Sequence, residues 1–340
     1  MPSRVTRFIF ALLLGGALAV QVADSSPTAA SRADVVARLS RHEFHSNLHV
    51  NLHHYLFELG LMPDPAARLA AALPQDADPA ERAAFESAVS YYRAKLAHRD
   101  LLFDTYLSNI KQHLLRHASS DALTPGRMDA AHHAALLAAR PAYERYVWPR
   151  HDAANRRIVA DSLELLRTIE APTLARIEAL AGERFPDRLL VHLSWYGGEY
   201  NGYTTIHPAT VAVISSRAAG TARGNDDFVE LVFHEPAHAL ILPDRGTVAA
   251  AIADASRRQG IEAPRNLWHA LLFYLVGAAV EEQMTAHGRP DYVMYMRRNQ
   301  VFASLHHAIF APLPAYLAGQ VTLQAAVDKV LRRHAARPRP

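Results

Sequence analysis

The chain has 340 residues, of which 50% are hydrophobic and 20% are charged, and it contains no cysteine. This composition supports a packed core, and the lack of cysteine excludes disulfide scaffolds, thiolate zinc sites, iron–sulfur clusters and thiol catalysis. The formal charge is +3, from 36 basic and 33 acidic residues, and the arginines form no stripe, so we expect no nucleic-acid partner. The 20 histidines are unusual and call for a search for metal-ligand spacing.

The first residues have the pattern of an export signal. Arg4 and Arg7 precede an apolar run over residues 8–20, which is too short to span a bilayer comfortably and contains an A-x-A cleavage pattern ending at Ala19. We therefore predict a signal peptide over residues 1–19, cut after Ala19, and a mature protein that is periplasmic or secreted. After cleavage we expect no stable membrane insertion.

Residues 20–184 are predicted to form a helical N-terminal domain. From residue 34 onward, apolar residues recur at intervals of three and four, which is the period of an amphipathic helix. Asp78 followed by Pro79 is typical of an N-cap and a first-turn proline. Gly182 marks the expected end of the last of these helices.

Residues 185–340 are predicted to form a second domain that starts with strands. Residues 188–195 have the pattern of a strand, Asn201-Gly202 is typical of a tight turn, and residues 203–215 are largely extended. Pro208 cannot donate to a β-ladder, so this segment is expected at the sheet edge. The predicted fold class is α+β, predominantly helical, with a small antiparallel sheet beside the first of five later helices, at residues 226–242, 247–258, 266–285, 291–310 and 321–335.

The segment His234-Glu235-Pro236-Ala237-His238 is an H-E-x-x-H motif within an apolar helix. Residues four apart lie on one helix face, so the imidazoles of His234 and His238 can bind one ion. Glu235 lies about 100° around the helix and can reach a metal-bound water without binding the metal. Zinc lowers the pKa of that water to about 7, and the glutamate can take its proton during attack on a carbonyl. The motif therefore predicts Zn²⁺ as cofactor, His234 and His238 as metal ligands, and Glu235 as the general base of a hydrolase.

Two further features concern the start and the end of this helix. Asp227 and Glu230 have the spacing of a capping box, so we expect Asp227 to cap the helix. Pro236 stands inside the motif, where an interior proline removes a backbone hydrogen bond and costs about 3 kcal/mol. The helix must kink at this proline or be stabilised there by packing and metal binding, and an inactive descendant of an enzyme is the alternative.

The region from Arg188 to Gln283 resembles the zincin metallopeptidases, in which an edge strand precedes the H-E-x-x-H helix and a second helix carries a third ligand. The resemblance covers under a third of the chain and implies zinc, peptide hydrolysis, and a peptide or protein substrate. Additional segments are similar to an exported bacterial branch of that group, namely Phe44-His45-Ser46-Asn47, Asn51-Leu52-His53-His54-Tyr55, Leu267-Trp268-His269-Ala270 and Phe273-Tyr274.

The third metal ligand is expected on the next long helix, and we favour His269. A catalytic zinc takes three protein ligands and leaves one position for water. A histidine in so apolar a helix needs a partner, because an unpaired buried polar group costs about 1–3 kcal/mol. Glu281 and Glu282 are the alternatives, since glutamate-bearing zincins would use a residue there. They lie about 18 Å farther along the helix, so they cannot share an ion with His269.

A second group of histidines lies near the N-terminus. His45, His49 and His53 are four apart and form a stripe on one helix face, with His54 beside them. The stripe could be a second metal site, a wall of the active cleft, or polar side chains bonded to neighbouring backbone.

The function predicted from the sequence is zinc-dependent hydrolysis, with a metallopeptidase as the first choice. One alternative is hydrolysis of a non-peptide amide or ester at the same site. The other is a non-enzymatic exported protein, either a histidine-rich metal-binding protein or a helical interaction module whose motif is vestigial.

Overall fold

The computed structural model describes residues 34–206 and 210–336. Within these ranges the chain has the predominantly helical α+β fold that the sequence predicts. The predicted signal peptide and Pro208 lie outside the described residues. None of the helices in the two described ranges is long and apolar enough to cross a membrane.

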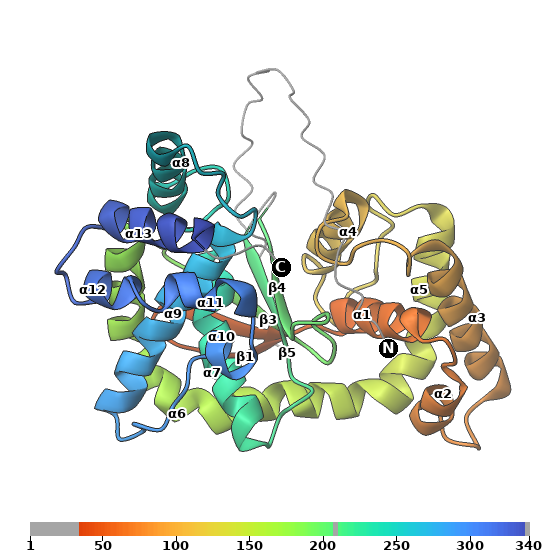
Figure 1. The fold of residues 1–340 in the computed structure, drawn as a ribbon. Coiled ribbons are helices and arrows are strands. Elements are labelled where there is room, and N and C mark those ends of the chain that lie inside the picture. Colours follow the sequence, from red (N-terminus) through yellow and green to blue (C-terminus); the bar gives the residue numbers. More distant parts are fainter. Residues whose placement is uncertain (1–33, 207–209, 337–340) are drawn as a thin grey trace.

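One five-stranded sheet stands in the middle of the molecule (Figure 1). Its strands are β1 (Val35–Arg38), β2 (His42–Ser46), β3 (Leu189–Ser194), β4 (Gly202–Thr205) and β5 (Val211–Ser215). Their order is β1-β2-β3-β5-β4. The outer pairs are antiparallel, but β2 with β3 and β3 with β5 are parallel. The sheet is mixed, so the prediction of an antiparallel sheet is wrong for the central pairs.

The position of β4 agrees with the predicted sheet edge, whereas that of β5 does not. β4 is the last strand and pairs only with β5 among the described strands, while β5 pairs with β3 and β4 on its two sides. Asn201, before β4, has a φ of 63°, as expected for the predicted turn. After β3 the chain makes this turn and enters β4, which does not pair with β3. β5 lies between the two strands and pairs with both.

The first two strands correct the prediction that the chain is helical from residue 34. All five residues of β2, His42-Glu43-Phe44-His45-Ser46, are buried. A strand that is buried on both faces lacks the alternation of apolar and polar residues by which strands are recognised. Its polar side chains are accommodated by partners from distant parts of the chain.

Helices lie on both sides of the sheet (Figure 1). The helices before β3 are α1 (Leu48–Leu61), α2 (Ala66–Ala72), α3 (Pro79–Lys95), α4 (Thr105–Leu114), α5 (Ala130–Ala142), a π-helical turn (Tyr143–Val147) and α6 (Trp148–Ala181). The predicted helix ends are confirmed at two places. The Asp78 side chain accepts hydrogen bonds from the first backbone N–H groups of α3, and Gly182 ends α6 with a φ of 69°.

The helices after β5 closely follow three of the five predicted positions, those at residues 247–258, 266–285 and 321–335. The helices are α7 (Ala222–Ala237), α8 (Thr247–Gln259), α9 (Leu267–Ala286), α10 (Tyr295–Arg298), α11 (Ala303–Ile309), α12 (Leu313–Leu317) and α13 (Leu323–Ala335). The predicted helix 291–310 is instead divided between α10 and α11. Between them Gln300 and Phe302 have positive φ values of 54° and 51°, which a continuous α-helix does not allow.

The sheet separates two hydrophobic cores. Alternate residues of β5 point to opposite faces, so Ala212 and Ile214 join the core with α6, α7 and α9, while Val213 joins the core with α1 and α3 to α5. The long helix α6 runs along the base of the molecule below both groups (Figure 1). Pairing of β2 with β3 crosses the predicted domain boundary at residues 184 and 185. The division into two folding units there stays a prediction.

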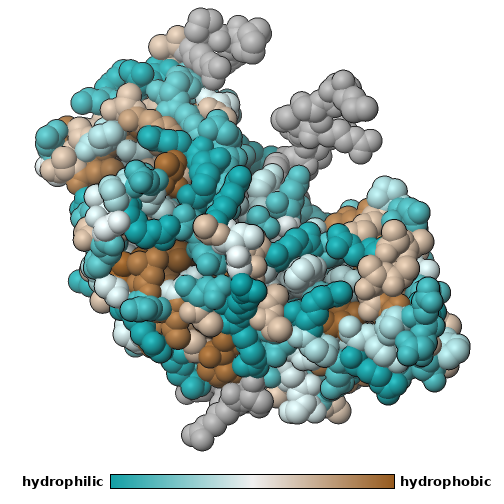
Figure 2. Space-filling model, turned by 90° about the horizontal axis from the view of Figure 1, so that it is seen from below, coloured by the Kyte–Doolittle hydropathy of each residue, from teal (hydrophilic) through white to brown (hydrophobic). Residues whose placement is uncertain are grey.

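Exposed hydrophobic side chains are scattered over the face of the molecule that Figure 2 shows. Seen from below, hydrophobic side chains form separate patches among hydrophilic ones (Figure 2). The exposed large hydrophobic side chains of the described residues lie on different elements and loops, namely Leu61, Phe103, Leu137, Tyr200 and Val293.

A buried carboxyl group connects α7 to the loop before α10. Glu230 Oε2 accepts a hydrogen bond of 2.5 Å from the Tyr292 hydroxyl and one of 2.6 Å from the Tyr295 backbone N–H. Its other oxygen, Oε1, has no hydrogen-bond partner. Burial raises the pKa of Glu230 to about 7, and the two hydrogen bonds oppose this shift only in part.

This shift predicts a pH dependence of stability that is specific to Glu230. Between pH 4.5 and pH 7 the unfolded chain releases the proton of this carboxyl while the folded chain keeps it, so stability falls as pH rises. Relative to Glu230→Gln, we expect the free energy of unfolding of the wild type to fall by up to about 1.4 kcal/mol per pH unit across this range. Urea denaturation at pH 5, 6 and 7 measures the difference, with Glu262→Gln at an exposed position as control. A difference that is constant with pH would contradict the expectation.

Candidate metal centre

The motif helix α7 begins earlier than predicted and ends at the motif. Thr221 caps it by accepting a hydrogen bond from the Gly224 backbone N–H, so the predicted cap at Asp227 is wrong. Asp227 lies inside the helix and pairs with Arg298 at 2.5 Å. The helix continues through Pro236 to Ala237, which leaves His238 as the C-terminal cap residue.

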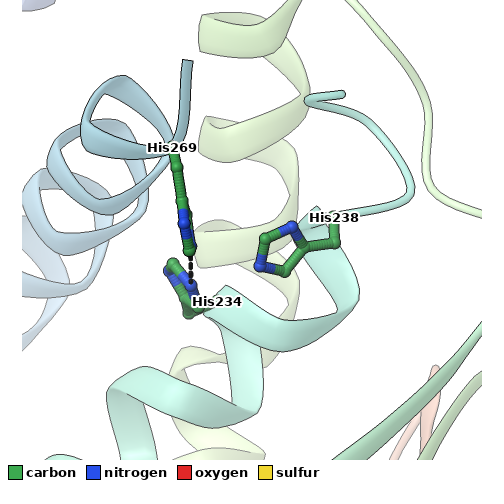
Figure 3. A group of neighbouring side chains, drawn as sticks. All are labelled: His234, His238 and His269. Carbon is green, nitrogen blue, oxygen red and sulfur yellow. Dashed lines mark hydrogen bonds between the residues drawn. The ribbon is translucent and has the colours of Figure 1, made fainter. Parts of the chain in front are cut away.

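The structure brings together the three histidines that the sequence predicts as ligands. His234 and His238 come from the end of α7, and His269 comes from the first turn of α9 (Figure 3). One ring nitrogen from each lies within 4.8 Å of the other two. The Nε2 atoms of His234 and His269 are 3.4 Å apart. Two nitrogens bound at about 2.1 Å to one tetrahedral ion would be about 3.4 Å apart, so the observed separation suits a shared metal ion.

The protonation state of these rings also suits metal binding. Burial holds the pKa of His238 at about 4, and burial together with the neighbouring imidazoles holds the pKa values of His234 and His269 well below their usual range. All three rings are therefore neutral at pH 7, the form in which imidazole binds metals. His234 Nδ1 is buried without a hydrogen-bond partner. An all-imidazole donor set of this kind fits a divalent transition-metal ion.

The glutamates considered as alternative ligands lie elsewhere. Glu282 is exposed and pairs with Arg176 at 3.1 Å, and neither Glu281 nor Glu282 belongs to the three-histidine group. Among the His, Asp and Glu side chains of the described residues, those that meet at this point are histidines only.

Glu235 stands beside the edge strand β4. Its Oε2 atom lies 2.7 Å from Thr204 Oγ1, which is also 2.8 Å from the Glu235 backbone oxygen. Its Oε1 atom lies against Gly202, where an added Cβ would come within 2.7 Å of it. Burial raises the pKa of Glu235 to about 8, and the hydrogen bond from Thr204 opposes this shift in part. The carboxyl group thus lies beside β4 and is not part of the three-histidine group.

Aromatic rings support the histidines. Phe273 stacks on His234 with ring centres 3.8 Å apart, and Trp268 stacks on His269 at 4.9 Å. Phe302 lies 5.3 Å from His269 with its backbone in the left-handed region. No role for these rings was predicted from the sequence, although Phe273 follows His269 by four residues and therefore lies on the same helix face. Thr204 and Gly202 were also missed, and no local pattern indicates them.

The histidines near the N-terminus are not part of this centre. His49 Nε2 lies 3.0 Å from the Ala118 backbone oxygen, and His53 Nδ1 lies 2.8 Å from the Tyr92 hydroxyl. His54 contacts Ser194 Oγ and the Tyr203 hydroxyl, and the ring of His45 stacks on that of His192. His49 matches the predicted alternative of a polar side chain bonded to backbone, whereas His53 and His54 bond to other side chains. His45 lies on β2, so the predicted stripe on one helix face is wrong for this residue.

Comparison of the chain with models of known protein families, with curated proteins and with solved structures gives no match.

Proposed function

We propose that this protein is a zinc-dependent hydrolase and, within that class, a metallopeptidase. The observation that carries the proposal is the meeting of the imidazoles of His234, His238 and His269 at one point, with the unligated carboxyl of Glu235 on the same helix. The histidines are the proposed ligands. A zinc ion in this position would supply a polarised water and a Lewis acid for attack on a carbonyl.

Glu235 is the proposed general base. Thr204 holds its Oε2 atom, which leaves Oε1 to accept a proton from the attacking water. After it has taken this proton, the carboxyl can deliver it to the leaving group. Thr204 thus orients the base, and Gly202 leaves space for it.

The choice of a peptide substrate rests on β4. This strand lies at the edge of the sheet beside Glu235, and the side on which no other described strand pairs with it can bind an extended chain. A peptide bound in this way would lie along the strand whose Thr204 holds the base. The signal-peptide pattern before residue 20 supports a periplasmic or secreted location.

Metal analysis tests the ligand assignment. We expect about one zinc per chain in the purified mature protein and a loss of zinc affinity of more than about 100-fold in His234→Ala, His238→Ala and His269→Ala, because each removes a direct ligand. Glu281→Ala and Glu282→Ala should bind zinc like the wild type. Retained affinity in His269→Ala, with a loss in either glutamate variant, would disprove the assignment. Absence of zinc, or several weakly held ions, would favour the non-enzymatic alternative.

Peptide hydrolysis tests the role of Glu235. We expect Glu235→Gln to bind zinc normally and to lose about 10²- to 10⁴-fold in kcat, because the amide cannot accept the proton. A library of unstructured peptides, with cleavage followed by mass spectrometry, provides the assay, and a panel of simple esters and amides tests the second class of substrate. Full activity in Glu235→Gln would refute the mechanism.

A further inference from the structure

Pro236 leaves one backbone hydrogen bond of α7 unmade. In an α-helix the N–H of residue 236 would donate to the backbone oxygen of Val232, four residues earlier, but proline has no N–H. Val232 is completely buried, so water is a poor substitute donor. The unmade bond lies in the last turn of α7, between the two proposed ligands His234 and His238.

The missing donor is supplied by a histidine from the sheet. His42 Nε2, on β2, lies 3.1 Å from the Val232 backbone oxygen. The same ring has its Nδ1 atom 2.8 Å from Glu170 Oε1, on α6. Both partners are oxygens that accept hydrogen bonds, so each ring nitrogen is placed to donate to one of them. His42 therefore joins α7 to α6 through one buried side chain.

Glu170 holds this ring in place. Its carboxylate also accepts hydrogen bonds from the Ser40 hydroxyl and from the backbone N–H groups of Ser40, Arg41 and His42. Burial alone would raise the pKa of Glu170, but the hydrogen bonds from His42, Ser40 and the backbone outweigh it and keep the pKa at about 2. The group is thus an ionised acceptor that fixes the turn between β1 and β2, from which His42 reaches α7.

We propose that His42 and Glu170 are a positioning pair, which replaces the hydrogen bond that Pro236 cannot make and so holds the last turn of α7 in the geometry that directs His234 and His238 to one metal ion. The inference rests on the proposed function in one respect, namely that these histidines bind a metal. Neither member of the pair touches the metal position.

The test is a double-mutant cycle in the full mature chain, with zinc affinity measured by chelator competition and ligand geometry by the visible spectrum of the Co²⁺-substituted protein. His42→Ala should weaken zinc binding about tenfold or more and change the Co²⁺ spectrum. Pro236→Ala restores an N–H at position 236. In that background the same His42 substitution should change the affinity less than about threefold, since the helix now makes its own bond. Glu170→Gln should show the same dependence on residue 236 with a smaller effect.

His45→Ala is the matched control, because His45 is a buried histidine on the same strand that stacks on His192. It should leave zinc affinity within about threefold of the wild type in both backgrounds. Equal losses of zinc affinity on His42→Ala with and without Pro236 would overturn the proposal. They would mean that His42 acts only as the partner of Glu170 or through its packing in the core. No loss with Pro236 present would overturn it as well.

Urea denaturation in excess chelator separates this inference from the proposed function. The four proteins compared are the wild type, His42→Ala, Pro236→Ala and the double variant. If the wild type binds no metal, the proposed function fails. The replaced hydrogen bond is still supported if His42→Ala lowers the urea midpoint less in the Pro236→Ala background than in the wild type. If the shifts of the urea midpoint caused by His42→Ala and Pro236→Ala are additive, the proposal is overturned. Should His42→Ala alone fail to fold, the double variant must fold, and its failure to do so would also overturn the proposal.

Discussion

The burial of α7, an apolar helix that carries several polar groups, is the constraint on which the rest of the structure depends. α7 packs against β3, β4 and β5 on one side and against α6 and α9 on the other. An unpaired polar group in such a place costs about 1–3 kcal/mol, so partners from other segments stabilise several polar groups of α7. Glu230 hydrogen-bonds to the loop before α10 and Glu235 hydrogen-bonds to β4. The Val232 carbonyl hydrogen-bonds to a side chain of β2. The burial of α7 therefore determines which distant segments must meet around it.

The same constraint gives Glu235 its place in the chemistry. A carboxyl at the metal would be a ligand, and a carboxyl in open water would be a weak base with an ordinary pKa. Glu235 is instead held by one hydroxyl at the edge of the sheet, where burial raises its pKa to about 8. Gly202 permits this approach, because any larger residue would meet the carboxyl.

The sequence predicted the local features of the molecule and missed the non-local ones. The spacing of His234 and His238 and the apolar surroundings of His269 were sufficient to identify the three histidines that meet. Strand order was not predictable, because β2 and β3 are joined through six helices and no local pattern encodes that pairing. β2 itself was missed because its buried polar residues lack alternation. Thr204 and His42 act on α7 through single contacts between distant parts of the chain, and such contacts leave no periodic signal.

The end of α7 explains why these outside contacts matter for a metal site. The His238 N–H bonds to the backbone oxygen of Glu235, three residues earlier, so the helix has already tightened at the second proposed ligand. His238 is therefore less firmly positioned by its own helix than His234 is. Its ring instead lies 5.8 Å from Trp268 and 4.9 Å from His269, both on α9. The geometry of the three imidazoles consequently depends on how α9 packs against α7 and on what completes the last turn of α7. The spacing of the motif alone is necessary for this geometry but does not produce it.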